Sequence, residues 1–307
     1  MLTLDFINVG YGDSILLRHM RTDGVQEAVL IDAGDTDDAA CYEKGRIRCT
    51  EFLAQQGVQA LDALVLTHLH KDHVGGLPAL AEAIPIRRVF TAYLPPAAVG
   101  VDLSAPPPFS GAALALAQGV QGYVRALRIL AARGTQIVPV APGQGTLALT
   151  DTLSVSYWLD WRGRLAEQQA ILDTYLSGSD PVQSAQALSR LDGFINNLSI
   201  VLLLESGGAR ALLPGDVYAS FWNSHLPPSG CGLVKIPHHG HADAADRALI
   251  DRLDPQIAVI CVSNDRTDDC PSARLLSLLA GRCTVLRTDP PPGAPARASI
   301  ALTLPFS

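Results

Sequence analysis

Six of the eight histidines lie in two short segments, and these segments are where this sequence is most able to do chemistry. The first segment, residues 67–73, places His68, His70 and His73 beside Asp72 in an H-x-H-x-D-H pattern. Residues two apart in an extended chain project to the same side, so His68 and His70 can reach one metal ion. Asp72 and His73 follow a turn and can address a second ion nearby.

The second segment contains His238, His239 and His241 and also follows a strand-like apolar run. Asp216 comes after another apolar run and a Pro-Gly pair, where its carboxylate could bridge two metals. Imidazole and carboxylate ligands without a nearby thiolate suit Zn²⁺, Mn²⁺ or iron rather than a structural zinc site. Two ions about 3.5–4 Å apart can share a hydroxide nucleophile. We therefore expect two divalent ions, with Zn²⁺ as the preferred metal and Mn²⁺ as the alternative.

Composition limits the other classes of function. Of 307 residues, 48% are hydrophobic and 17% are charged, which allows a large buried core and excludes a disordered chain. The formal net charge is −7 and no basic run occurs, so a polybasic arm for duplex DNA or lipid is excluded. No apolar run approaches the roughly 20 residues that a bilayer requires, so we expect no membrane partner.

The six cysteines include no C-x-x-C pair, and the chain opens on a strand-like run without the pattern of a secretion signal. Both features favour reduced thiols and a cytoplasmic location.

Apolar runs broken by turn residues predict strands in both halves of the chain. The expected strands are 2–9, 14–18, 28–31, 63–67, 199–205, 209–213, 232–236, 257–262 and 284–287. Expected helices at 49–56, 244–253 and 272–279 fall between them. This alternation predicts an α/β fold with two packed sheets and outer helices, in one domain that spans residues 1–307.

Two segments lie outside this alternation. Residues 95–134 begin with a Pro- and Ala-rich stretch and continue into an expected helix at 112–132. Residues 160–192 are also expected to be mostly helical. We interpret both segments as insertions over the core, beside the site.

The motifs as a set resemble the metallo-β-lactamase superfamily, and in particular the hydrolase domain of the ComEC/Rec2 competence proteins. The matching segments are residues 6–14, 30–34, 67–76, 196–199, 212–216 and 235–240. The resemblance implies an αβ/βα sandwich of two mixed sheets flanked by helices, with a two-metal site along one edge of the sheets.

The resemblance also implies roles for individual residues. The implied metal ligands are His68 and His70 for metal one, Asp72 and His73 for metal two, Asp216 as the bridge, and His238 or His239 to complete the set. Asp32 would support the metal loop through hydrogen bonds. Asn197 and Ser199 would contact the substrate.

The sequence departs in three ways from the pattern of the competence-type branch, that is, the ComEC/Rec2 hydrolase domains, and these departures bear on the implied roles. No histidine lies between His73 and His225, so the usual additional ligand of metal one is missing, and that site is either weaker or completed by His238. His241 stands where the branch usually has serine. Cys270 stands near an expected histidine, as a thiolate ligand or as a plain buried cysteine.

The resulting hypothesis is a two-metal hydrolase, a phosphodiesterase or nuclease that acts through a metal-bound hydroxide. Asp72 or Asp216 would orient the hydroxide, and His241, or His239 if it is not a ligand, would protonate the leaving oxygen. Lys235 would place positive charge near the phosphate.

Two other hypotheses of function stay open. One is a hydrolase of a carboxylic ester, thioester or lactone on the same site, and the other is a metal-free binding or regulatory protein. A small phosphodiester or single-stranded nucleic acid is the expected substrate. The competence proteins also carry a membrane channel, which this sequence lacks, so we expect a freestanding hydrolase. The sequence leaves the oligomeric state open.

Overall fold

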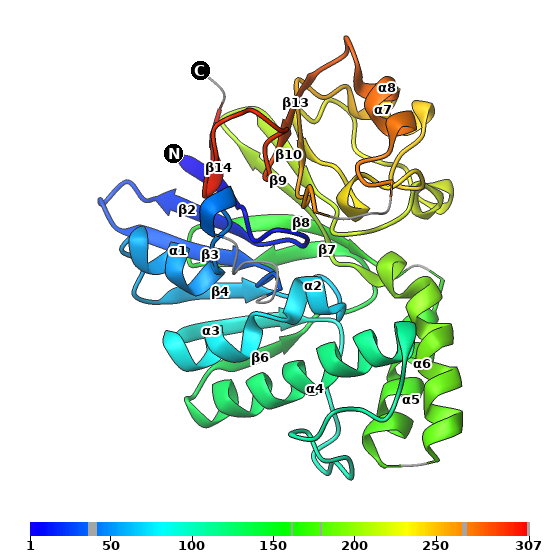
Figure 1. The fold of residues 1–307 in the computed structure, drawn as a ribbon. Coiled ribbons are helices and arrows are strands. Elements are labelled where there is room, and N and C mark those ends of the chain that lie inside the picture. The colour runs from blue at the N-terminus through cyan, green and yellow to red at the C-terminus, as the bar shows by residue number, and fades with distance from the viewer. Residues whose placement is uncertain (36–41, 161, 179, 266–268, 306–307) are drawn as a thin grey trace.

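The computed structural model describes residues 1–35, 42–160, 162–178, 180–265 and 269–305. In this described part, two seven-stranded sheets pack on one another and helices cover their outer faces (Figure 1). This is the αβ/βα sandwich expected from the sequence, and the expectation is confirmed.

The first sheet has the strand order β14-β1-β2-β3-β4-β5-β6. Its strands are β1 (Leu2–Ile7), β2 (Ile15–Met20), β3 (Gln26–Ile31), β4 (Leu61–Val65), β5 (Ile86–Thr91), β6 (Gln136–Pro139) and β14 (Ser299–Leu304). The β14-β1-β2-β3 part is antiparallel, and the β3-β4-β5-β6 part is parallel.

The second sheet has the strand order β13-β12-β11-β10-β9-β8-β7. Its strands are β7 (Gly143–Ala148), β8 (Ser154–Leu159), β9 (Val201–Ser206), β10 (Ala209–Leu213), β11 (Leu233–Lys235), β12 (Ile257–Ile260) and β13 (Thr284–Arg287). Strands β7 to β10 pair antiparallel, and β10 to β13 pair parallel.

The alternation of side chains along each strand explains the layers. In β2, Ile15 and Leu17 join the core between the sheets, whereas Leu16 points to the helices on the outer face. Strands with helices on one face and a second sheet on the other are buried on both sides, which is why they read as continuous apolar runs.

Helices α1 (Cys49–Gln55), α3 (Leu77–Ala83) and α4 (Gly111–Ala132) cover the first sheet, and α7 (Arg247–Leu253) and α8 (Ala273–Leu279) cover the second. Helices α5 (Arg164–Leu176) and α6 (Pro181–Ile195) pack beside α4 (Figure 1). In the described residues, no helix combines the length and the apolar character needed to cross a bilayer.

The structure confirms the expected strands and helices, with end points that shift by a few residues. Strands β5, β6, β7, β8 and β14 lie outside the expected set. Paired arginines interrupt the apolar run of β5, and glycines interrupt β7, so the local sequence signal is weak there.

The topology brings four chain segments to one edge of the sandwich. These are the β1–β2 turn, the end of β4 with the short helix α2 (Lys71–Val74), the end of β10, and the end of β11 with the 3₁₀ turn η5 (His238–Gly240). Gly12, at φ +132°, fits so closely that a Cβ there would lie 2.1 Å from the Asp72 carbonyl oxygen. The amide of Asp13 donates to the same carbonyl over 3.2 Å.

Replacing Gly12 by alanine should therefore lower the free energy of unfolding by about 3 kcal/mol, because the added methyl group overlaps the backbone of α2. Gly24, at φ +85°, is the matched control, since a Cβ added there would meet no atom within 4 Å. Gly24→Ala should cost about 1 kcal/mol from backbone strain alone. Urea unfolding measures both, and equal losses would refute the close approach at Gly12.

Candidate metal centre

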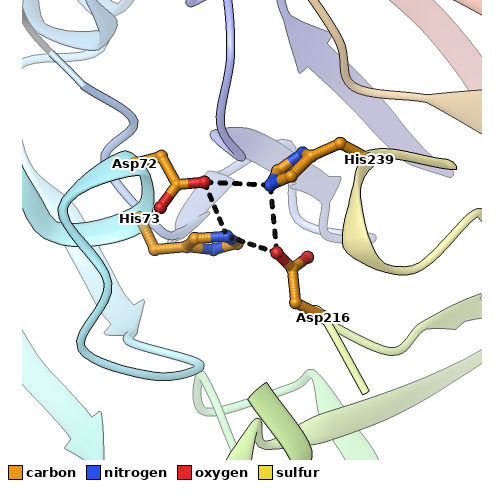
Figure 2. A group of neighbouring side chains, drawn as sticks. All are labelled: Asp72, His73, Asp216 and His239. Carbon is orange, nitrogen blue, oxygen red and sulfur yellow. Dashed lines mark hydrogen bonds and ion pairs between the residues drawn. The ribbon is translucent and has the colours of Figure 1, made fainter. Parts of the chain in front are cut away.

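Four side chains converge at this edge of the sandwich, as Figure 2 shows. Asp72, His73, Asp216 and His239 each present one ligand atom, and all four atoms lie within 4.8 Å of one another. The Nε2 atom of His239 is 3.0 Å from carboxylate oxygens of both Asp72 and Asp216. The Nε2 atom of His73 is 3.1 Å from Asp216 Oδ2 and 3.9 Å from Asp72 Oδ2.

The tautomer of His73 is fixed from behind. Its Nδ1 is 2.7 Å from Asp32 Oδ2, so the Nδ1–H donates to this carboxylate and Nε2 faces the other ligand atoms, where it can bind a cation once it loses its proton. Asp32 also accepts from the amide and the hydroxyl of Thr67, at 2.8 and 2.6 Å. Asp32 therefore ties the histidine to the loop that leaves β4, as the resemblance implied.

The structure separates the two histidines that the sequence left as alternatives. His239 donates from Nδ1 to the Cys261 carbonyl over 2.9 Å, which leaves Nε2 for the cluster. The side chain of His238 instead lies 2.8 Å from Asp243, and only its backbone amide contacts Asp216, over 3.1 Å. Both histidines have positive φ, of 46° and 50°, a strained geometry that is common at functional sites.

Lys235 does not have the place expected from the sequence. Its side chain is fully buried, and its ammonium group donates to the Gly215 carbonyl and to Asp216 Oδ1, each over 2.9 Å, and to Asp13. Three protein oxygens surround the amine, and Lys235 is not among the residues that line the cavity at the cluster, so the geometry does not support the expected contact with substrate. Lys235 instead orients Asp216 so that Oδ2 points to the cluster.

The charges in the cluster shift one another's pKa. Burial alone would lower the pKa of His239, but Asp216 and Asp72 raise it to about 9. Burial opposes protonation of His73 too, yet Asp216, Asp32 and Asp72 raise its pKa well above the ordinary value. Burial works in the other direction on Asp216, whose pKa is held far below its usual range by His239, Lys235 and His73. The metal-free cluster therefore holds protons where a cation would bind.

The expected site of metal one is less complete. His68 Nε2 and His70 Nδ1 are 3.2 Å apart, so both could contact one ion. Within the described residues, however, neither histidine belongs to a group of three or more His, Cys, Asp or Glu ligand atoms. His238 does not supply the missing ligand, since it turns to Asp243. The pKa of His68 is well below its ordinary value because of burial and the adjacent histidines His73 and His70.

A second group of three possible ligands, Asp13, Asp32 and His73, lies behind the cluster. Its atoms already serve the support network, because Asp13 pairs with Lys235 and Asp32 with Thr67 and His73. The donor set therefore fits one divalent ion well, at Asp72, His73, Asp216 and His239.

The remaining expected residues lie around this cluster. Ser199 is fully buried, and its hydroxyl contacts His68 over 3.2 Å and accepts from the Asp216 amide over 3.1 Å, so the geometry does not support the expected substrate contact there either. Asn197 accepts from the Tyr218 amide over 2.9 Å and lines a neighbouring cavity rather than that of the cluster. The thiol of Cys270 donates to the His239 carbonyl over 2.9 Å.

The five cysteines in the described residues carry free thiols. Cys41 lies outside the described part of the chain.

A cavity of about 330 Å³ opens onto the cluster. Its lining residues include Tyr11, Asp192 and Asn196, which were not predicted from the sequence. The Tyr11 hydroxyl is 3.0 Å from His241 Nε2, and the Tyr11 ring lies 4.3 Å from that of His239. A larger cavity of about 740 Å³ lies at the opposite ends of β4 and β5 and contains none of the cluster residues.

The sequence is similar to that of known proteins. The family model described as the metallo-beta-lactamase superfamily matches residues 7–91, which include the H-x-H-x-D-H segment. The chain is also similar to the ComE operon protein 3 of Bacillus subtilis (strain 168), with 23% identity over 93% of this chain. It spans only 32% of the length of that protein.

The solved structures that match this chain share little sequence identity with it. Zn²⁺-bound PqqB from Methylobacterium extorquens is 14% identical, with 99% of this chain and 100% of that chain covered and a TM-score of 0.49. The metallo-beta-lactamase fold protein YhfI from Bacillus subtilis is 8% identical, with 98% and 99% covered and a TM-score of 0.48. A diphosphatase from the PhnP family is 12% identical, with 100% and 99% covered and a TM-score of 0.47.

The chain resembles the metallo-beta-lactamase superfamily over residues 7–91, and the ComE operon protein 3 over most of its own length. Together with the His and Asp cluster, this supports a metal-dependent hydrolase.

Metal analysis of protein purified without chelator and then dialysed should find close to one divalent ion per chain. His239→Ala should reduce the content several-fold, because it removes one of four ligands. His68→Ala should leave it near one, since His68 lies outside the four-ligand cluster. Two tightly held ions per chain would contradict this assignment of the sites.

The affinity for the metal should rise with pH. The raised pKa values of His73 and His239 mean that both imidazoles carry protons at neutral pH without metal, and binding must release these protons. Between pH 6 and 8, below the His239 value of about 9, the dissociation constant should fall at least about tenfold per pH unit. Competition with a fluorescent chelator measures it, and a flat profile would disprove the linkage.

Proposed function

We propose that the chain is a metal-dependent phosphodiesterase that works with one tightly bound divalent ion. The observation that carries the proposal is the four-ligand cluster with both histidine tautomers fixed, at the floor of a cavity. A divalent ion bound there would act as a Lewis acid on a phosphoryl oxygen and lower the pKa of a water molecule. Zinc and manganese both suit this donor set.

The side chains around the cluster have complementary tasks. Asp72 is the most exposed of the four ligands, with a side chain 21% exposed, so its carboxylate can also orient a water from the cavity side. Lys71 lines the cavity, with its ammonium 3.5 Å from Asp35, and places a positive charge beside a bound phosphate.

Protonation of the leaving oxygen requires a donor that faces the cavity. Tyr11 lines the cavity, whereas His241 stands behind it, within hydrogen-bond distance of the Tyr11 hydroxyl. We infer that the Tyr11 hydroxyl is the group beside the leaving oxygen and that His241 holds this hydroxyl in place. In this proposal Tyr11 has the proton-donating role that the sequence analysis gave to His241, and His241 acts on it through the Tyr11 hydroxyl.

The segments 95–134 and 160–192 fit the proposal as insertions into a single domain that spans residues 1–307. Ala115 of α4 and Asp192 of α6 both line the cavity, so each segment supplies part of its wall.

A small phosphodiester is a better substrate than a long nucleic acid. The net charge is −7, and four carboxylates line the cavity, those of Asp35, Asp72, Asp192 and Asp216. One divalent ion and Lys71 offset most of the charge of these carboxylates, and each phosphate beyond the scissile one would add to the excess of negative charge.

Hydrolysis of bis-p-nitrophenyl phosphate with added Mn²⁺ or Zn²⁺ tests the proposal. Asp72→Asn should lower kcat/KM at least about 1,000-fold while the thermal midpoint changes little, because a metal ligand of the reaction is lost. Asp251→Asn, a matched change at an exposed ion pair with Arg282, should keep wild-type turnover.

Metal-loaded protein that cleaves p-nitrophenyl carboxylic esters but not the phosphodiester would refute the proposed bond specificity. Equal turnover of wild-type protein and Asp72→Asn would refute the metal-dependent reaction itself.

A further inference from the structure

One side of the cavity carries a buried acceptor that no group in the described part of the chain satisfies. The side chain of Asn196 lines the cavity although only 3% of the residue is exposed. Its Nδ2 donates to the Tyr218 hydroxyl over 3.1 Å, whereas its Oδ1 has no hydrogen-bond partner in the described structure. A buried amide oxygen without a donor is costly and rare, so its partner is expected from a bound molecule.

Asp192 places a second acceptor beside the first. It precedes Asn196 by four residues at the end of α6, and the helical conformation continues through Asn196, so both side chains lie on one face. Asp192 also lines the cavity, and its Oδ1 is 3.2 Å from His70 Nε2. Its side chain is 33% exposed, so the carboxylate can accept further hydrogen bonds from the cavity.

The two acceptors on this side of the cavity exclude most kinds of ligand group. Another phosphate or carboxylate would be repelled by the negative charge of Asp192 and by the lone pairs of the Asn196 oxygen. An ammonium group would lose its water shell at the nearly inaccessible Asn196 oxygen, which costs far more than burying a hydroxyl group. Neutral hydroxyl groups donate one hydrogen bond each and suit both acceptors.

Building on the proposed phosphodiesterase function, we propose that Asn196 and Asp192 form a subsite for the hydroxyl groups of a ribose-like sugar next to the scissile phosphodiester. One hydroxyl donates to Asn196 Oδ1 and its neighbour to the Asp192 carboxylate. The subsite makes the protein select substrates with adjacent hydroxyl groups over deoxygenated ones. It adds specificity that the metal cluster alone does not give.

Calorimetric binding of two nucleotides tests the subsite without turnover. The probes are adenosine 5′-monophosphate and its 2′,3′-dideoxy analogue, each titrated into metal-loaded protein. Wild-type protein should bind the ribose compound about tenfold more tightly or better, the effect of one net hydrogen bond to a buried acceptor. Asn196→Ala should reduce this preference several-fold without weakening the binding of the dideoxy compound. Asn223→Ala, at an exposed position, should keep the wild-type preference.

A second variant guards against misfolding. Asn196→Asp retains an acceptor oxygen and should keep the preference for ribose, with thermal unfolding measured for every variant. Metal content of Asn196→Ala should equal that of the wild type, and a lower content would reassign the oxygen to a metal ion and overturn the subsite.

Equal affinities of the two nucleotides for wild-type protein, no binding of either, or an undiminished preference in Asn196→Ala would each overturn the subsite. The outcome is separable from the proposed function. A protein that prefers the ribose compound but does not cleave bis-p-nitrophenyl phosphate would keep the subsite and lose the phosphodiesterase.

Discussion

The buried ammonium group of Lys235 is the interaction on which the arrangement of this site depends. It joins Asp13, from the β1–β2 turn of the first sheet, to Asp216, which follows β10 of the second. A charge in the interior is tolerated only when opposite charges and hydrogen bonds surround it, and here three protein oxygens do so. The two sheets are thereby fixed relative to each other directly below the metal ligands.

The orientation of three of the four ligands, Asp216, His73 and His239, follows from such supports. Lys235 takes one oxygen of Asp216 and leaves the other for the cluster, while Asp32 and the Cys261 carbonyl each take the Nδ1–H of one histidine. These contacts fix the positions of the ligand atoms before any ion binds. They also hold several carboxylates close together, which is electrostatically unfavourable. The raised pKa of His239, about 9, is the physical consequence of this concentration of negative charge.

The sequence predicts the parts of the site that rest on local patterns. The spacing from His68 to His73 and the strand-like runs before each motif are enough to place the histidine segments and Asp216 at one sheet edge. The burial of Lys235 is not predictable in this way, because its partners Asp13 and Asp216 are distant in sequence. Asn196 lines the cavity in place of the expected Asn197. Which of the two does so depends on the conformation of one 3₁₀ turn, η3 (Asn196–Leu198), and the periodicity of the sequence does not fix it. Likewise, only the conformation of η5 separates His239 from His238.

The central claim is that one divalent ion binds Asp72, His73, Asp216 and His239. Anomalous diffraction from crystals grown with Mn²⁺ tests it most directly, with data collected on both sides of the manganese absorption edge. We expect one strong peak in contact with all four side chains and at most a weak peak at His68 and His70. A principal peak at the His68–His70 pair, or none within reach of Asp216 and His239, would contradict the claim.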